Sequence, residues 1–178
     1  MVRAFIAVGS NIDPAANVRL AIGHLARRVR VVGISMVYRT EALGRPEQPA
    51  YYNCVVEVET AVPPQDLKQG ILRPIEDSLG RMRGDDKFAP RTIDLDLIVY
   101  GDLVMDDGGI ILPDPEIMKR PFLAIPLSEL APDLVLASCS RRIAEIASGL
   151  EQGGLQPLND YARQLQDELE QVVLEFRE

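Results

Sequence analysis

Hydrophobic and polar residues alternate most regularly in the stretch APRTIDLDLIVYG, from Ala89 to Gly101. Because successive side chains of a β-strand point to opposite faces, this alternation predicts a strand with two different faces. One face carries Ile93, Leu95 and Leu97, and the other carries Thr92, Asp94, Asp96 and Ile98. Carboxylates about 7 Å apart on one strand face repel each other, and aspartate is uncommon in strands. The aspartate pair is therefore either solvated on an exposed sheet face or placed there for a chemical role.

The rest of the first hundred residues predicts three further strands and two helices. Apolar and β-branched runs predict the strands, at 3–10, 31–40 and 52–61. Helical spacing of apolar residues predicts the helices, at 15–29 and 64–80. Pro74 lies inside the second helix, so we expect a kink there or a shorter helix. With the aspartate strand, the order is β-α-β-β-α-β, which is typical of an α+β ferredoxin-like sandwich.

The chain after Gly101 predicts smaller elements around this sandwich. A hairpin is expected to turn at Asp107–Gly109, short helices to follow within 121–136 and 140–150, and an amphipathic helix to end the chain. One side of this last helix carries Ala162, Leu165, Leu169, Val172, Val173 and Phe176. We therefore expect a single domain over 1–178, with a C-terminal helical extension at about 140–178. This extension either packs on its own domain, leaving a monomer, or forms a homodimer interface.

Charge and composition exclude several classes of function. The 178 residues include 27 acidic and 19 basic side chains, and the net charge of −8 argues against general nucleic-acid binding. The N-terminus lacks the apolar core of a signal peptide, and no apolar run approaches the roughly 20 residues of a membrane span. We therefore expect a cytoplasmic protein without a membrane partner. The two cysteines and the single histidine form no metal-ligand pattern.

Four arginines accompany the aspartate pair in the sequence. Arg81 and Arg83 lie in the segment before the strand, Arg91 immediately precedes it, and Arg120 follows later. Carboxylates are suitable ligands for Mg²⁺ and arginines bind phosphate oxygens, so the combination predicts a site for a metal-bound polyphosphate. The glycine-rich loops of the two common nucleotide-binding motifs are absent from the sequence. The arginines and aspartates are thus the main candidates for phosphate binding.

Four segments of the sequence, taken together, resemble one enzyme family. They are IAVGSN (6–11), YRTEALGRPEQPAYYNCVV (38–56), IEDSLGRMRGDDKFAPRTIDLDLIVYG (75–101) and LPDPEIMKRPFLAIPLSELAP (112–132). They are similar to 6-hydroxymethyl-7,8-dihydropterin pyrophosphokinase of folate biosynthesis, in register from about residue 3 to about residue 135. The resemblance implies transfer of pyrophosphate from ATP to the hydroxymethyl group of the pterin, with AMP as the second product and two Mg²⁺ ions at the site.

The same resemblance implies roles for individual residues. Asp94 and Asp96 would hold the Mg²⁺ ions and, with Arg81 and Arg91, form the catalytic set. The expected pterin-binding residues are Thr40, Leu43, Tyr51, Asn53 and Phe122. The expected nucleotide-binding residues are Glu76, Arg81, Arg91, Asp114 and Arg120. The segments Glu41–Ala50 and Met82–Ala89 are expected to be loops that close over bound substrates.

Three positions differ from the family pattern. Phe88 stands where the family has a tryptophan, Glu41–Ala42 replaces a proline pair, and Asp114 replaces a histidine that contacts ATP. Because a carboxylate cannot donate to a phosphate, Asp114 either repels the triphosphate or pairs with Lys119 or Arg120 to fix the turn. These differences leave two rival hypotheses, a homologue with weakened catalysis and a non-catalytic ligand-binding module on the same fold.

Overall fold

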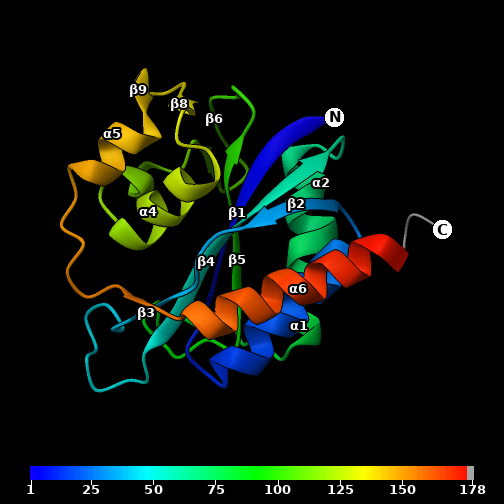
Figure 1. Ribbon diagram of the computed structural model, residues 1–178, viewed down its shortest axis with the longest axis vertical. Helices are drawn as coiled ribbons and strands as arrows, with labels where there is room; N and C mark the ends of the chain where they lie inside the picture. The colour runs from blue at the N-terminus through cyan, green and yellow to red at the C-terminus, as the bar shows by residue number, and fades with distance from the viewer. Residues whose placement is uncertain (176–178) are drawn as a thin grey trace.

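A six-stranded antiparallel sheet forms the centre of the computed structural model, which describes residues 1–175 (Figure 1). In spatial order its strands are β10 (Gln156–Pro157), β3 (Tyr38–Thr40), β4 (Tyr51–Thr60), β1 (Val2–Ser10) and β5 (Asp94–Tyr100), and β2 (Arg30–Ile34) also pairs with β4. Each neighbouring pair is antiparallel. The order β5, β1, β4 and then β2 with β3 is that of a ferredoxin-like βαββαβ unit, which confirms the predicted α+β fold.

Helices cover both faces of this sheet. The helices on one face are α1 (Pro14–Ala26), α2 (Pro64–Leu67), the π-helical turn η1 (Lys68–Leu72), α3 (Arg73–Ser78) and α6 (Asn159–Glu175). The helices on the other face are α4 (Pro121–Leu130) and α5 (Ile143–Ser148). Figure 1 shows α6 alongside α1, with α4 and α5 across the sheet from them. Within residues 1–175, no helix is long and apolar enough to cross a membrane.

Short elements complete the described chain. They are β6 (Met105–Asp107), β7 (Ile110–Leu112), the 3₁₀-helix η2 (Pro115–Met118), β8 (Val135–Leu136) and β9 (Arg141–Arg142). β6 and β7 form the predicted hairpin, and its turn residues Gly108 and Gly109 both have positive φ, which glycine adopts at little cost. η2 lies directly before α4 and contacts it, so it faces the same side of the sheet.

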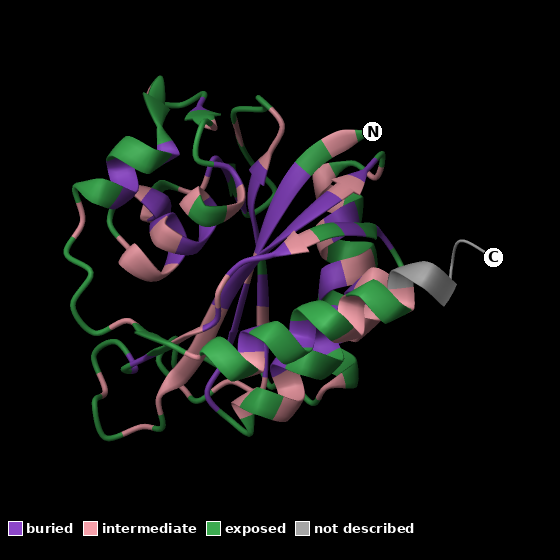
Figure 2. Cartoon of the chain, viewed as in Figure 1, coloured by how far each residue is buried: buried purple, intermediate pink, exposed green. Residues whose placement is uncertain are grey.

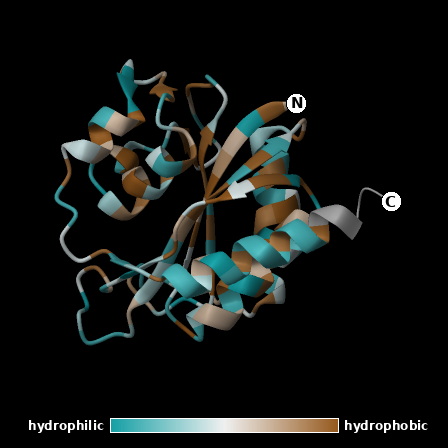
Figure 3. Ribbon diagram, viewed as in Figure 1, coloured by the Kyte–Doolittle hydropathy of each residue, from teal (hydrophilic) through white to brown (hydrophobic). Residues whose placement is uncertain are grey.

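The sheet separates two apolar cores. Ala4, Ile6 and Val8 of β1 belong to the core beneath α1, whereas Phe5 belongs to the core beneath α4, as the alternation of a strand requires. Figure 2 shows buried residues concentrated along the strands, and Figure 3 shows hydrophilic residues on the outward side of α6. The same alternation on β5 places Leu95 and Leu97 in the α1 core and directs the two aspartates to the α4 side, where Ile98 and Val99 join the second core.

The prediction of one strand at 31–40 is wrong at its middle, where residues 35–37 separate β2 from β3. The hydroxyl of Ser35 accepts a hydrogen bond of 2.9 Å from a main-chain N–H of β4. The carboxylate of Glu129 on α4 accepts one of 2.9 Å from the N–H of Met36. Side chains therefore supply two of the hydrogen-bond partners here, although the N–H of Ser35 still donates to the carbonyl of Val55 at 3.0 Å.

The helix predicted at 64–80 contains a wide turn at η1, between α2 and α3. Pro74 follows in the first turn of α3, and a wider turn accommodates it because proline has no N–H to donate. Leu67 and Leu72 are both fully buried although they are five residues apart, a spacing that a regular α-helix would rotate to different sides. The expected disturbance at Pro74 is thus a π-helical turn.

The C-terminal extension packs on its own chain. Ala162 and Leu165 of α6 are buried in the same core as α1. Val173 and Phe176, which were predicted on the apolar side of this helix, lie outside the residues whose side chains the structure describes. A homodimer through α6 stays a prediction.

Candidate active site

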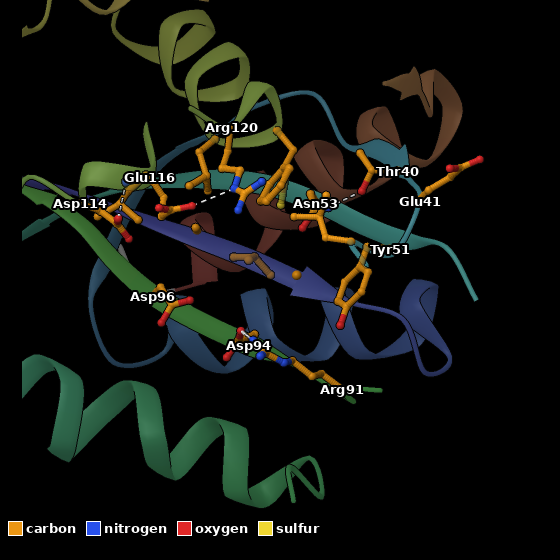
Figure 4. Close-up of a pocket in the computed structure, with 18 of the residues that line it drawn as sticks. Thr40, Glu41, Tyr51, Asn53, Arg91, Asp94, Asp96, Asp114, Glu116 and Arg120 are labelled. Atoms are coloured by element: carbon orange, nitrogen blue, oxygen red, sulfur yellow. Dashed lines mark hydrogen bonds and ion pairs between the residues drawn. The ribbon is translucent and has the colours of Figure 1, made fainter. Parts of the chain in front are cut away.

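A cavity of about 540 Å³ opens on the side of the sheet that α4 covers. The predicted site residues that line it are Thr40, Leu43, Tyr51, Asn53, Arg91, Asp94, Asp96, Asp114, Arg120 and Phe122. Glu76 and Arg81, which were also predicted, are not among the residues that line it. Figure 4 shows the acidic residues of β5 along one wall and the polar pair of Asn53 and Thr40 towards the other end.

Asp94 and Asp96 project from the same face of β5 into the cavity (Figure 4). Asp94 forms an ion pair with Arg91. Nη2 of Arg81 lies 3.9 Å from Oδ1 of the same aspartate. The Arg81 side chain is largely buried, and its Nε has no hydrogen-bond partner within the described chain. Two arginines are therefore held against the first aspartate of the pair.

Asp96 occupies a more negative environment. Its side chain is exposed to the cavity, but protein atoms surround the carboxyl group on nearly all sides. This desolvation, together with the negative charges of Asp94, Glu76 and Asp114, raises the pKa of Asp96 to about 7.

The excess of negative charge around Asp96 favours a bound cation. No group of three or more His, Cys, Asp or Glu side chains that could hold a metal occurs within residues 1–175. Mg²⁺ commonly uses one or two carboxylates of the protein and completes its coordination with water and substrate phosphates. Asp94 and Asp96 fit that donor set. They are too few to enclose a metal entirely with protein ligands.

Glu76 lies on α3, on the opposite side of β5 from the cavity. Its side chain is buried, and Oε1 accepts a hydrogen bond of 2.8 Å from the N–H of Leu95. Its other oxygen forms an ion pair with Arg83, which also binds Asp77. Burial raises the pKa of Glu76, and the charge of Asp94 adds to this shift. Glu76 therefore holds the strand between the two aspartates, and its predicted contact with the nucleotide stays a prediction.

Asn53 and Thr40 form a polar pair at the other end of the cavity. Nδ2 of Asn53 donates a hydrogen bond of 2.7 Å to the hydroxyl of Thr40, so the amide is held in one orientation. Gly9 lies beside it on β1, where a Cβ atom would come within 2.8 Å of the Asn53 Oδ1. Glycine is therefore required at position 9 for this orientation. Leu43, Tyr51 and Phe122 supply apolar and aromatic surface around the pair.

The segment after β7 brings three charged residues to the cavity. Oδ1 of Asp114 accepts a hydrogen bond of 2.8 Å from the N–H of Glu116, which caps η2. Arg120 donates from Nε to Glu116 at 2.8 Å, and Lys119 pairs with the same glutamate at 3.6 Å. The predicted alternative in which Asp114 pairs with Lys119 or Arg120 is therefore wrong, because Glu116 holds both cations.

Two loops meet over one end of the cavity. Arg45 pairs with Asp86 at 2.8 Å, and Nε2 of Gln48 donates to the carbonyl of Phe88 at 2.9 Å. These contacts join residues 41–50 to residues 82–89, the segments predicted to close over substrates. These contacts hold the two loops against each other, and their closure upon binding stays a prediction.

Sequence reasoning missed two residues that organise this site. Asn11 is 1% exposed and accepts a hydrogen bond of 2.7 Å from the N–H of Arg91, while its Nδ2 donates to the carbonyl of Pro49 at 3.2 Å. It therefore ties the 41–50 loop and the segment between the 82–89 loop and β5 to the end of β1. Glu116 was also missed, although its spacing of four residues before Arg120 is a signal for a helical ion pair.

A comparison with protein-family models identifies the family of the chain. The family described as 7,8-dihydro-6-hydroxymethylpterin-pyrophosphokinase (HPPK) matches residues 5–132. The chain belongs to the HPPK family. The matched range contains all of the predicted site residues, from Thr40 to Phe122.

Curated relatives of the HPPK family resemble most of the chain. A Synechocystis protein named 2-amino-4-hydroxy-6-hydroxymethyldihydropteridine pyrophosphokinase is 37% identical over 175 residues, covering 89% of this chain and 88% of the relative. A protein of the same name from Methylorubrum extorquens is 36% identical over 159 residues, covering 88% of this chain and 98% of the relative.

Solved structures support the fold. The crystal structure of wild-type Plasmodium falciparum HPPK-DHPS with SDX-DHP matches with a TM-score of 0.61 at 13% identity, and the match covers 83% of this chain. This chain spans 43% of that longer protein. At this identity the likeness concerns the HPPK fold alone.

Proposed function

We propose that this chain transfers the pyrophosphoryl group of ATP to the hydroxyl of 6-hydroxymethyl-7,8-dihydropterin, releasing AMP in a step of folate biosynthesis. The membership in the HPPK family and the names of the curated relatives support the reaction. One observation supports this cavity as the site of the reaction. The cavity combines the two carboxylates of Asp94 and Asp96 with Arg91 and Arg120, and it ends at the amide of Asn53, which Thr40 holds in one orientation.

The pterin would occupy the end of the cavity at Asn53. Because Nδ2 is engaged by Thr40, Oδ1 is available to accept from the N–H groups of the pterin's amide edge. Phe122 offers an aromatic face for stacking against a flat ring, and Tyr51 adds a second aromatic side chain. This arrangement would direct the hydroxymethyl group towards the aspartates of β5.

The triphosphate would lie along the acidic wall, between Arg91 and Arg120. Both arginines are paired with carboxylates, Arg91 with Asp94 and Arg120 with Glu116. A guanidinium presents several N–H donors, so each arginine can bind phosphate oxygens through donors that its carboxylate partner does not occupy. In phosphoryl transfer, such positioning and charge neutralisation supply most of the catalysis, and no protein nucleophile is needed.

Asp94 and Asp96 would hold the two Mg²⁺ ions. When bound, such ions neutralise phosphate charge and lower the pKa of a coordinated hydroxyl. The residues of the chain contribute the rest: they align the hydroxyl with the β-phosphorus and keep water away from it.

The test is the identity of the nucleotide product. Purified protein with ATP, Mg²⁺ and 6-hydroxymethyl-7,8-dihydropterin should yield AMP and the pterin diphosphate in equal amounts. Formation of ADP would contradict pyrophosphoryl transfer. Binding of both substrates without AMP would favour the rival ligand-binding module, and a very slow appearance of AMP would favour the weakened homologue. The variant Asp96→Ala serves as the control, because it lacks one of the two carboxylates proposed to hold Mg²⁺ and should form little AMP.

A further inference from the structure

The segment that joins α5 to α6 lies against the edge of the sheet next to the pterin end of the cavity. In Figure 1 it runs from α5 down to β3 and turns there into α6. This segment lies beyond the residues that the HPPK family model matches. Its contacts with β3 and β4 suggest a role in substrate binding.

The first of these contacts is main-chain pairing. β10 pairs with β3, with Gln156 opposite Arg39 and Pro157 opposite Tyr38. The N–H of Leu158 then donates a hydrogen bond of 2.8 Å to the carbonyl of Val37. β3 has only three residues and pairs on its other side with β4. Without β10 it would be a short edge strand with unpaired main-chain groups.

The second contact is made by Tyr161 at the start of α6. Its ring packs edge-on against Tyr52 of β4, with ring centroids 5.5 Å apart, and its hydroxyl donates to the carbonyl of Ala15 at 2.7 Å. Because side chains alternate along a strand, Tyr52 points away from the cavity while its neighbours Tyr51 and Asn53 face it. Tyr161 therefore supports the strand directly behind two pterin-side residues.

Both contacts converge on the pair of Asn53 and Thr40. Thr40 is the last residue of β3, and it is opposite Tyr51 in the ladder with β4. Its hydroxyl lies 2.7 Å from Nδ2 of Asn53, so a small displacement of β3 relative to β4 would break this hydrogen bond. The orientation of the amide then depends on how firmly the two strands are held together.

We infer that residues 156–161 are a positioning element for the pterin site, and we call them the β3 clamp. The clamp contacts no substrate; it acts through Thr40 and Asn53 by holding β3 against β4. This inference rests on the proposed function, because it assumes that the Asn53 end of the cavity binds the pterin. It assigns a role in substrate binding to a part of the chain that lies outside the matched family range.

The inference predicts a separation between the two substrates. Loosening the clamp should weaken pterin binding and leave ATP binding almost unchanged, because the hydrogen bonds and ion pairs of Arg91, Arg120 and Asp94 in the described chain go to residues outside the clamp. Loss of one strand hydrogen bond should raise the KM and the Kd for the pterin by about 3- to 10-fold. At saturating pterin, kcat should stay within about two-fold of the wild type, since the chemistry itself is untouched.

The experiment compares Leu158→Pro with Leu158→Ala. Both variants lose the leucine side chain, but only proline also removes the N–H that binds Val37. Pterin affinity is measured by the intrinsic fluorescence of the pterin and ATP affinity by calorimetry, well below the unfolding temperature of each variant. The KM for the pterin should be higher in the proline variant than in the alanine variant, while the KM for ATP should be equal in the two.

A second pair of variants keeps the inference testable if Leu158→Pro does not fold. Tyr161→Leu removes the ring that packs on Tyr52, while Tyr161→Phe keeps the ring and loses only the bond to Ala15. Tyr161→Leu should raise the pterin KM, Tyr161→Phe should largely restore it, and Arg163→Ala on the exposed side of α6 should match the wild type.

The inference would be overturned if the two variants of each pair bound the pterin equally well. It would also be overturned if a variant lost pterin affinity and ATP affinity to the same extent. If wild-type protein bound no pterin and produced no AMP, the proposed function itself would fail. The wild-type control therefore distinguishes the two failures.

Discussion

The buried carboxylate of Glu76 accepts a hydrogen bond of 2.8 Å from the main-chain N–H of Leu95, the residue between Asp94 and Asp96. β5 is the outer strand of the sheet, so this N–H has no neighbouring strand to bind. A side chain from α3 thus supplies the acceptor that a further strand would provide. The spacing and direction of the two aspartates depend on this bond, although Glu76 lies outside the cavity.

Replacement of Glu76 should separate its acceptor role from its charge. Glu76→Ala leaves the Leu95 N–H unsatisfied, which should lower the free energy of unfolding by about 1–3 kcal/mol. Glu76→Gln keeps an acceptor oxygen and should lower it less. Urea denaturation of both variants measures the difference. An equal loss of stability in the two variants would show that the negative charge, through its pair with Arg83, matters more than the bond to Leu95.

Removal of either aspartate should affect turnover far more than pterin binding. Asp94→Ala and Asp96→Ala should each lower kcat by at least about 100-fold, because one metal-held charge is worth several kcal/mol in the transition state. The pterin Kd should change little, since Asn53 and Thr40 are untouched. Steady-state kinetics and pterin fluorescence measure the two quantities. Near-normal turnover of Asp96→Ala at ordinary Mg²⁺ concentrations would contradict the metal site.

Neutralisation of Asp96 should stabilise the free protein while it inactivates the enzyme. The pKa of Asp96 is raised to about 7, so the folded state binds this proton more tightly than the unfolded chain does. Wild-type stability therefore rises as the pH falls from above 7 towards about 4, the pKa of an unperturbed aspartate. Asp96→Asn lacks this gain, so its unfolding temperature should exceed that of the wild type at pH 8, and the difference should shrink at pH 5.5.

Addition of Mg²⁺ and ATP should reverse the order at pH 8, because the wild type alone retains both carboxylates for the cation. Thermal unfolding with and without these ligands provides the comparison. An Asp96→Asn variant that is less stable than the wild type at pH 8 without ligand would contradict the repulsion.

Asp114 should weaken ATP binding by its charge while it stabilises η2 by its cap. Asp114→Asn keeps an acceptor for the N–H of Glu116 and removes the charge, so it should tighten ATP binding several-fold; one like charge near a phosphate costs on the order of 1 kcal/mol. Asp114→His offers a donor as well and should tighten binding further. Asp114→Ala loses the cap, which should cost about 1 kcal/mol of stability. Titration with a non-hydrolysable ATP analogue at two salt concentrations tests the charge effect, and unchanged affinity in Asp114→Asn would refute it.

The contact between the two loops should be weak and sensitive to salt. Arg45 and Asp86 are both partly exposed, so their ion pair is worth about 0.2–1 kcal/mol. Arg45→Gln should speed limited proteolysis within both loops by about 1.5- to 5-fold, while the matched variant Arg45→Lys should differ less from the wild type. High salt should remove the difference. Faster cleavage in the Arg45 loop alone would mean that the pair does not couple the loops, and bound ATP and pterin should slow cleavage in both.

Alternation and family resemblance together predicted much of this structure. The faces of β5 followed from its own sequence, because strand alternation is a local property, and most residues matched to the family meet in one cavity. What the sequence did not predict depends on partners far along the chain. The interruption at Ser35 requires β4 and Glu129, and the position of Glu76 requires the π-helical turn before it. Asn11 reaches Pro49 and Arg91 only because the fold brings both residues to the end of β1.

Because η1 contains one residue more than an α-helical turn, it sets the number of residues needed between Pro64 and Glu76. The extra residue rotates everything that follows it by about 100° around the helix axis. Glu76 comes four residues after the turn, and it faces Leu95 only with that rotation in place. Deletion of Gly70 would give a more regular helix and would turn the carboxylate away from β5, so this deletion should cost more activity than deletion of Gly153 in the loop before β10. The number of residues in the helix, as much as their types, keeps the two aspartates aligned.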